Sequence, residues 1–221
     1  PPNLNAALWG RIFCRNFMGI CWHMVCRINL LRNRFSVLHN ITWASFLMDD
    51  IKYSNIEDGQ QVDTSLVLNC LQKGDAKLAL QYCHDLLAKD PQHIQTLLFA
   101  ALASRSLEWL DSALDFINRA MLLAPKQPAI YSLMGDILLL QKRPEPALEA
   151  LLKAHRLGDT SAQINFNIGS AYLALGIYED AKIYFDQALS IDPHMVPAHV
   201  NKGLAEHSLT NLDAALDCFD A

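Results

Sequence analysis

The chain has 221 residues, of which 52% are hydrophobic, and its formal net charge at pH 7 is -5. All 23 acidic residues stand at or after Asp49, whereas residues 1–48 contain five arginines and no lysine. The part of the chain after residue 48 is therefore acidic overall, which argues against nucleic-acid binding, because neutralising phosphates requires a clustered basic face.

Residues 1–59 do not follow the pattern of the rest of the chain, and three interpretations of them stay open. They contain three of the four tryptophans, Trp9, Trp22 and Trp43. This basic and aromatic composition fits an N-terminal cap of a helical array, or a targeting or membrane-surface segment. Alternatively, residues 1–47 are not native coding sequence, because Met48 heads a normal-looking acidic start.

Residues 60–221 repeat with a period of 34 residues. One alanine recurs at this spacing without insertion or deletion, as Ala79, Ala113, Ala147, Ala181 and Ala215. A fixed period of this length is typical of a helical array. We number positions within the rows 60–93, 94–127, 128–161, 162–195 and the truncated 196–221.

Each row contains two segments in which apolar residues recur every three or four positions, which predicts two amphipathic helices. Gly74 and Gly176 separate the two segments in rows one and four, where a left-handed residue can end a helix. Proline cannot continue a helix. In the third row, Asp159 takes the place of the prolines that close other rows, namely Pro91, Pro125 and Pro193.

Row four, residues 162–195, shows the pattern most clearly. Its signature residues are Ile168, Gly169, Tyr172, Gly176, Tyr178, Ala181, Phe185, Ala188 and Pro193. This pattern resembles the tetratricopeptide repeat, and the resemblance covers residues 60–221. It implies an all-α fold, a right-handed α-solenoid of stacked antiparallel helix pairs.

Small residues recur where the two helices of a pair should face each other. A larger side chain at such a position would push the helix axes apart. Besides the alanine at position 20, the small residues are Gly135, Gly169 and Gly203 at position 8, and Ala120, Ala154 and Ala188 at position 27.

Other rows depart from this pattern. Cys70, Ser104 and Glu206 stand where row four has Tyr172. Row one is therefore expected to act partly as a cap, since terminal repeats are atypical. Row five breaks off at Ala221, which leaves an apolar helix face uncovered. We expect further repeats or another domain after it, or a fragment of a longer protein.

The six cysteines show no paired spacing, and a chain of this length does not need disulfides. Cys70 and Cys83 fall at apolar positions and are predicted to be small buried hydrophobic residues. A reducing compartment fits this usage, so we predict a cytoplasmic protein. No stretch reaches the roughly 20 apolar residues of a membrane span, so no membrane contact is predicted for the array.

Neither catalysis nor metal binding is predicted. The group Cys14, Cys21, His23 and Cys26 has none of the spacings of structural zinc sites. The adjacent acids Glu179 and Asp180 fall in the first turn of a predicted helix, where negative charge is favoured. Since no glycine-rich phosphate loop is present either, we predict a protein that is no enzyme, with no cofactor and no metal.

The resemblance implies a concave groove lined by the first helix of each row, which receives an extended peptide or a helix of a partner protein. Its lining positions are 2, 5, 6, 9, 12 and 13. They supply the predicted peptide-binding residues Gln95, Arg105, Ser132, Asp136, Gln163, Asn167, Ser170 and Asn201.

Asn167 and Asn201 are consecutive at position 6, and an asparagine can both donate to and accept from a peptide backbone. In repeats like those of O-linked GlcNAc transferases, a ladder of asparagines does this. The basic clamp of the chaperone-binding subfamily is missing, because the matching positions hold Gln61, Thr64, Gln95 and Ala129.

Two hypotheses of function follow. The first is an interaction scaffold that binds an extended segment of a partner protein, whose identity the sequence leaves open. The second is the non-catalytic N-terminal repeat region of a larger enzyme, such as a glycosyltransferase or a sulfotransferase.

Overall fold

The structure is a computed structural model, and it describes residues 64–220, with side chains up to residue 218. Residues 1–59, for which three interpretations stay open, and the group Cys14, Cys21, His23 and Cys26 within them, lie outside the described residues.

The described part of the chain is built from helices, two to each row of the sequence, and we call the rows repeats one to five. In chain order the helices are α2 (Ser65–Gln72), α3 (Ala76–Lys89), α4 (Ile94–Ser106), α5 (Leu110–Leu123), α6 (Pro128–Leu140), α7 (Pro144–Arg156), α8 (Ala162–Ala174), α9 (Tyr178–Ile191), α10 (Val196–Ser208) and α11 (Leu212–Asp220).

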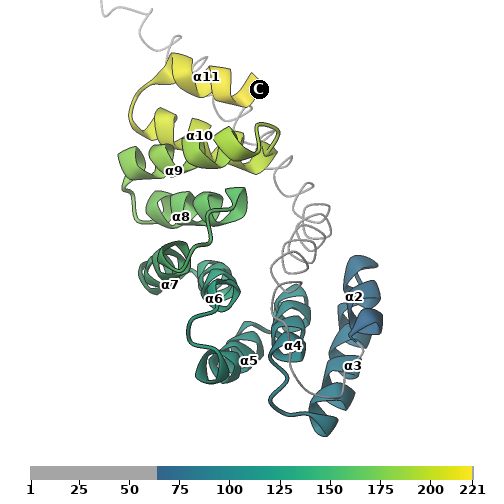
Figure 1. Cartoon of the computed structure of the whole chain (residues 1–221). Helices are drawn as coiled ribbons and strands as arrows, with labels where there is room; N and C mark the ends of the chain where they lie inside the picture. The colour runs from purple at the N-terminus through teal and green to yellow at the C-terminus, as the bar shows by residue number, and fades with distance from the viewer. Residues whose placement is uncertain (1–63, 221) are drawn as a thin grey trace, which may run out of the picture.

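Helices that follow one another in the chain also pack against one another, and short turns join them, so neighbours are antiparallel. Figure 1 shows that the stack curves. In that view α2, α4 and α6 lie on the inner side of the curve, and α3, α5 and α7 lie on the outer side. The predicted all-α solenoid of stacked helix pairs is confirmed.

The turn inside each pair requires one left-handed residue, at position 15. Gly74 and Gly176 adopt φ values of 79° and 75°, as predicted from the presence of glycine at this position. The same position holds Glu108, Lys142 and Thr210 in the other repeats, and their φ values are 61°, 59° and 66°. A β-branched residue such as Thr210 is strained there. The packing of the helix pair therefore imposes this turn even where glycine is missing.

The turn between pairs leaves a backbone carbonyl that a side chain satisfies in four repeats. The oxygen of Pro91 accepts from Arg119, that of Pro125 from the Tyr131 hydroxyl, and that of Pro193 from His199, at 3.0, 2.9 and 2.9 Å. Where Asp159 replaces proline, its own carbonyl lies 3.1 Å from His155 Nδ1. The prolines thus end one helix and also fix the next repeat.

Small residues let the two helices of a pair approach closely, as predicted. All five alanines of position 20 are buried. A Cβ atom added to Gly169 would lie 2.7 Å from the Phe185 ring and 3.1 Å from the Ala181 carbonyl oxygen. At Gly135 the added atom would lie 2.4 Å from the Leu151 side chain. No side chain fits between these helices without moving them.

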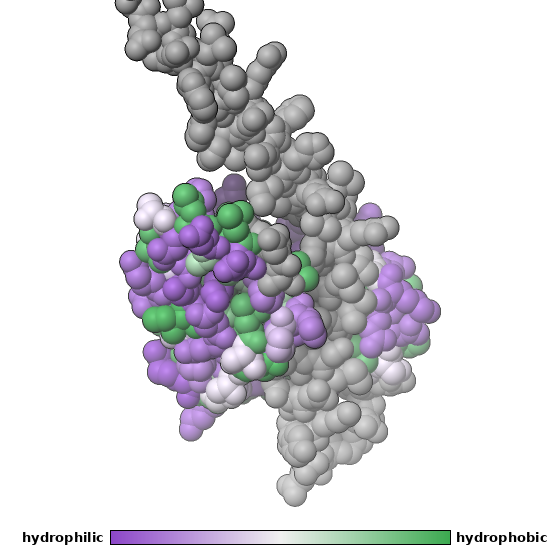
Figure 2. Space-filling view, turned by 90° about the horizontal axis from the view of Figure 1, so that it is seen from above, coloured by the Kyte–Doolittle hydropathy of each residue, from purple (hydrophilic) through white to green (hydrophobic). Residues whose placement is uncertain are grey.

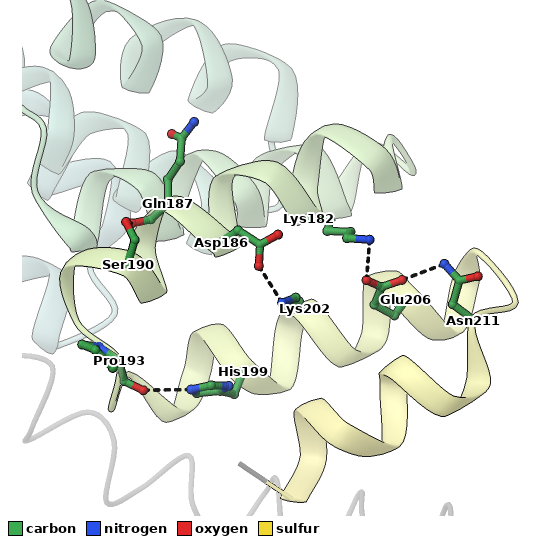
Figure 3. Close-up of polar contacts among 9 residues, drawn as sticks. All are labelled: Lys182, Asp186, Gln187, Ser190, Pro193, His199, Lys202, Glu206 and Asn211. Carbon is green, nitrogen blue, oxygen red and sulfur yellow. Dashed lines mark hydrogen bonds and ion pairs between the residues drawn. The ribbon is translucent and has the colours of Figure 1, made fainter.

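Position 11, where row four has its tyrosine, differs between repeats. The Tyr172 ring stacks on the Tyr184 ring with centroids 5.5 Å apart. In repeat five the same position holds Glu206, which is 2% exposed. Its carboxylate accepts from Asn211 Nδ2 at 2.8 Å and pairs with Lys182 Nζ at 2.7 Å (Figure 3). A buried charge at this site is therefore matched by a cation and an amide.

These contacts shift the pKa of both partners. The hydrogen bond from Lys182, followed by that from Asn211, lowers the pKa of Glu206 below its ordinary value of 4.5. The hydrogen bond to Glu206 raises the pKa of Lys182 above its ordinary value of 10.5. A second ion pair, Lys202 Nζ to Asp186 Oδ1 at 2.6 Å, also joins α10 to α9 (Figure 3). Two ion pairs therefore join repeat five to repeat four.

Of the two cysteines predicted to be buried, one is buried and the other is partly exposed. Cys83 is fully buried, and burial raises the pKa of its thiol to about 12. Cys70 is half-buried and packs against the same core. Neither forms a disulfide.

Apolar side chains remain exposed on the outer surface and at the last repeat. Leu212 and Leu216 of α11 are 58% and 61% exposed. Figure 2, seen from the end where α11 lies, shows such residues as separate hydrophobic patches among hydrophilic ones. Among the described helices, none combines the length and the apolar character needed to cross a membrane.

We predict that Gly169→Ala destabilises the array by about 1–3 kcal/mol, because the added methyl group overpacks against Phe185 and the Ala181 carbonyl. At an unconstrained helix position the same change would stabilise by about 1 kcal/mol. Thermal unfolding followed by circular dichroism measures the difference. The control is Ala174→Gly at an exposed position of the same helix, which should lose only the helix-propensity term. A melting temperature raised by Gly169→Ala would contradict the close approach.

We also predict that Glu206→Gln destabilises the protein at pH 7 by about 1–2 kcal/mol. The loss is limited to this range because Lys182 is partly exposed, so that solvent screens its attraction to the Glu206 carboxylate. Because the pKa of Glu206 is lowered by folding, its contribution is complete above about pH 4.5 and is lost as the pH falls below that value. The raised pKa of Lys182 sets the other limit, since its contribution is lost above about pH 10.5.

Melting temperatures of the wild type and of Glu206→Gln, measured from pH 7 down to pH 3, should therefore converge. The control Glu149→Gln changes an exposed carboxylate of α7 and should run parallel to the wild type. A difference between wild type and Glu206→Gln that stays constant with pH would refute the ion pair.

Candidate functional site

All the predicted groove residues lie on first helices, of which α4 and α6 lie on the inner side of the curve in Figure 1. Gln95 and Arg105 belong to α4, Ser132 and Asp136 to α6, the residues Gln163, Asn167 and Ser170 to α8, and Asn201 to α10. Whether these side chains bind a peptide stays a prediction. Their contacts divide them into two groups, one along α4 and α6 and the other along α8 and α10.

The first group contains an ion pair between neighbouring repeats. Arg105 Nε of α4 pairs with Asp136 Oδ2 of α6, and both side chains are less than a tenth exposed. Removing one partner of such a pair is strongly destabilising, because a charge is left buried. Arg105 and Asp136 therefore join repeats two and three, and the sequence alone did not indicate this pairing.

Ser132 takes part in a small network around Asp159. The Ser132 hydroxyl donates to Asp159 Oδ2 at 2.5 Å, and the Ser161 hydroxyl donates to Asp159 Oδ1 at 2.7 Å. Ser161 in turn caps α8 by accepting from the Ile164 amide. Asp159 is buried and positions the start of α8. In the sequence, only its position in place of a proline, two residues before Ser161, could have indicated this role of Asp159.

The second group is the pair of asparagines at position 6 and their neighbours. Asn167 is 2% exposed, and its Oδ1 accepts from Gln163 Nε2 at 2.9 Å. Its Nδ2 is buried and has no hydrogen-bond partner among the residues that the structure describes. An unpaired buried amide is costly, and native proteins contain few of them. Among the described residues this donor is therefore left without a partner.

Asn201 of α10 is half-buried and lies beside α8. Its Nδ2 donates to the Ser170 hydroxyl at 3.3 Å, and that hydroxyl donates to the Phe166 carbonyl at 2.8 Å. The structure thus brings Ser170 and Asn201 together across two repeats. Gln163 and Asn167 form the adjacent contact within α8.

A buried asparagine that the sequence did not single out lies in the same helix. Asn165 Nδ2 donates to the Ser161 carbonyl at 3.1 Å, and its Oδ1 has no hydrogen-bond partner in the described part of the chain. It stands at position 4, where other repeats hold Tyr131 and His199. Tyr131 and His199 contact the turn before their helix, and nothing in the sequence indicated that Asn165 differs from them.

Within residues 64–220, no three histidine, cysteine, aspartate or glutamate side chains gather in a group that could hold a metal ion. The predicted groove residues on the first helices are amides, hydroxyls and one ion pair. Such groups recognise hydrogen-bonding partners, above all the donors and acceptors of a peptide backbone.

The chain was compared with known protein families, curated sequences and solved structures. Residues 162–195 match the family model described as tetratricopeptide repeat. The chain is 27% identical over 150 residues to the probable UDP-N-acetylglucosamine--peptide N-acetylglucosaminyltransferase SPINDLY of Hordeum vulgare. That match covers 64% of this chain but only 16% of SPINDLY.

Solved structures share the fold at low sequence identity. PilW, described as a type IV pilus biogenesis factor, superposes with a TM-score of 0.66 at 22% identity, over 73% of this chain and 78% of its own. MamA from Desulfovibrio magneticus RS-1 gives 0.63 at 20% identity, over 71% and 88%.

YrrB, described as a TPR protein with an unusual peptide-binding site, gives a TM-score of 0.58 at 20% identity, over 71% of this chain and 81% of its own. These likenesses agree on the fold, and the matched repeat supplies the signature residues. Residues 162–195 therefore form a tetratricopeptide repeat, and the described helices share the fold of these solved structures.

Proposed function

We propose that the first helices of this protein bind an extended segment of a partner protein along the inner side of the stack. One observation carries the proposal. The Asn167 amide nitrogen is buried without a partner in the described residues, one repeat away from Asn201 at the equivalent position. A backbone carbonyl of a bound segment would satisfy this donor.

The charges and contacts of the site indicate what kind of segment it would accept. Asn167, Ser170 and Asn201 are uncharged, so they would contact the backbone of the segment more than its charged side chains. The half-buried Asn201 is the more accessible of the two asparagines. Recognition of backbone groups favours an extended segment, because a helix satisfies its own carbonyls and amides.

The Arg105–Asp136 pair supports a role as framework for this surface. It is buried and joins the first helices of repeats two and three, so it keeps the inner row rigid. A rigid site loses less entropy on binding than a flexible one. YrrB, which shares this fold, is described as having an unusual peptide-binding site, and this agrees with peptide binding by such an array.

A second candidate function is favoured by one finding, the match to SPINDLY, which is named as a probable glycosyltransferase. On this hypothesis the chain is the non-catalytic repeat region of a larger transferase. The coding sequence around this region decides the matter. A stop codon soon after the fifth repeat, together with no transfer of N-acetylglucosamine from its UDP donor by the native protein, would remove the hypothesis.

We predict that Asn167→Ala and Asn201→Ala each weaken binding of partner peptides by about 1–3 kcal/mol, or about fivefold to 150-fold, through lost backbone hydrogen bonds. Peptides selected from a proteome-derived display library provide the ligands, and isothermal titration calorimetry measures their Kd.

The matched control is Asn118→Ala, an exposed asparagine of the outer helix α5, which should bind like the wild type. Melting temperatures confirm that the variants are folded. If every selected peptide binds both asparagine variants with wild-type affinity, these side chains are not part of the site.

A further inference from the structure

A cavity lies between α3, α4 and α5. It has a volume of about 520 Å³ and is lined by Leu80, His84, Leu87, Ala88, Ser104, Trp109, Ser112, Asp115, Phe116 and Arg119. Trp109, Asp115 and Arg119 are exposed, whereas Ser104 is completely buried. The cavity therefore opens to solvent past α3 and α5, the outer helices in Figure 1, and Ser104 forms its floor.

The period of the repeat explains why this cavity exists. Ser104 stands at position 11 of repeat two, where repeat four has Tyr172. Phe116 stands at position 23, where repeat four has Tyr184, the residue on which Tyr172 stacks with ring planes 18° apart. Repeat two thus keeps the aromatic ring of position 23, as Phe116, and lacks the ring of position 11 that would stack on it.

Other repeats fill the equivalent space with their own side chains. In repeat five the space is taken by Glu206 together with Lys182 and Asn211. Repeat two has only a hydroxymethyl group at this position. The cavity of repeat two therefore lies where repeat four has a phenol ring, and the Phe116 ring forms one of its walls.

The floor of the cavity carries a polar group without a partner. The Ser104 hydroxyl is buried and has no hydrogen-bond partner among residues 64–220. Other helical serines of this chain, Ser170 and Ser208, donate to the carbonyl four residues earlier, at 2.8 and 2.9 Å. Ser104 does not, so its hydroxyl is left for a group that enters the cavity.

We propose that this cavity binds a tyrosine side chain of a partner protein. A ring that enters from solvent would stack on Phe116, as Tyr172 stacks on Tyr184 within repeat four. Its hydroxyl would reach the floor first and exchange a hydrogen bond with the Ser104 hydroxyl. The site is separate from the asparagines of the inner helices and does not depend on them.

The mouth of the cavity suits a side chain that is carried on a polypeptide. Arg119 lies over the Phe116 ring at 5.9 Å and donates to the Pro91 carbonyl, which holds it at the edge. His84 contacts the same ring from α3, with centroids 6.0 Å apart. Asp115 is exposed beside them and can accept from backbone amides next to an inserted tyrosine.

The test uses the indole N–H signal of Trp109, which lines the cavity, in ¹H–¹⁵N spectra of the full chain. Trp109→Phe identifies this signal among those of the four tryptophans. The probes are p-cresol, toluene and the peptide acetyl-Gly-Gly-Tyr-Gly-Gly-amide. We expect saturable shifts with p-cresol at a Kd of about 1 mM, and binding of the peptide at least as tight.

Two variants at one position separate the roles of ring and hydroxyl. Ser104→Ala should weaken p-cresol about threefold to tenfold and leave toluene unchanged. Ser104→Tyr should fill the cavity, as Tyr172 does in repeat four, and abolish binding of all three probes. The matched control Ser208→Ala removes an exposed helical hydroxyl of α10 and should bind like the wild type.

Several results would overturn the proposal. These are p-cresol shifts that do not saturate, shifts that persist in folded Ser104→Tyr, or an unchanged p-cresol Kd in Ser104→Ala. Binding of p-cresol without binding of the peptide would exclude a partner side chain and leave only small free phenols. Circular dichroism checks folding, and Ser104→Ala decides the matter if Ser104→Tyr does not fold.

Discussion

The close approach of the two helices in each repeat is the constraint on which the rest of the structure depends. At Gly169 a single added carbon would lie 2.7 Å from the Phe185 ring, and Ala181 contributes the carbonyl on the other side. Alanine stands at position 20 of every repeat, and glycine stands at position 8 of repeats three to five, so these positions do not separate the two helices. The turn at position 15 is then forced, and even Thr210 adopts a φ of 66°.

Much of the fold could be predicted from the sequence, because it depends on contacts within one period. The alanine at position 20 shows where each repeat begins and ends, and glycines such as Gly176 indicate the turn between the two helices of a pair. Thr210 shows the limit of that argument, since a residue type alone would not indicate a left-handed turn there. Only the period, carried over from repeats with glycine, predicts it.

The site was predicted less completely, because its contacts join different repeats. Arg105 pairs with Asp136, and Ser170 accepts from Asn201, and in both cases 31 residues separate the partners. A residue of one first helix thus meets a residue three positions earlier in the next repeat. This offset follows from how the pairs stack, so the positions of these polar residues could be predicted but their pairing could not.

Position 11 shows how a repeat architecture separates folding from binding. Tyr172, Glu206 and Ser104 occupy it in three repeats, as a stacked ring, an ion-paired carboxylate and the floor of an open cavity. The stability of a stacked array is roughly a sum over repeats and their nearest neighbours. Losing the ring in one repeat therefore costs stability only locally, while the close contacts at positions 8 and 20 continue to hold the helices. Such a position can change from packing to recognition without changing the fold.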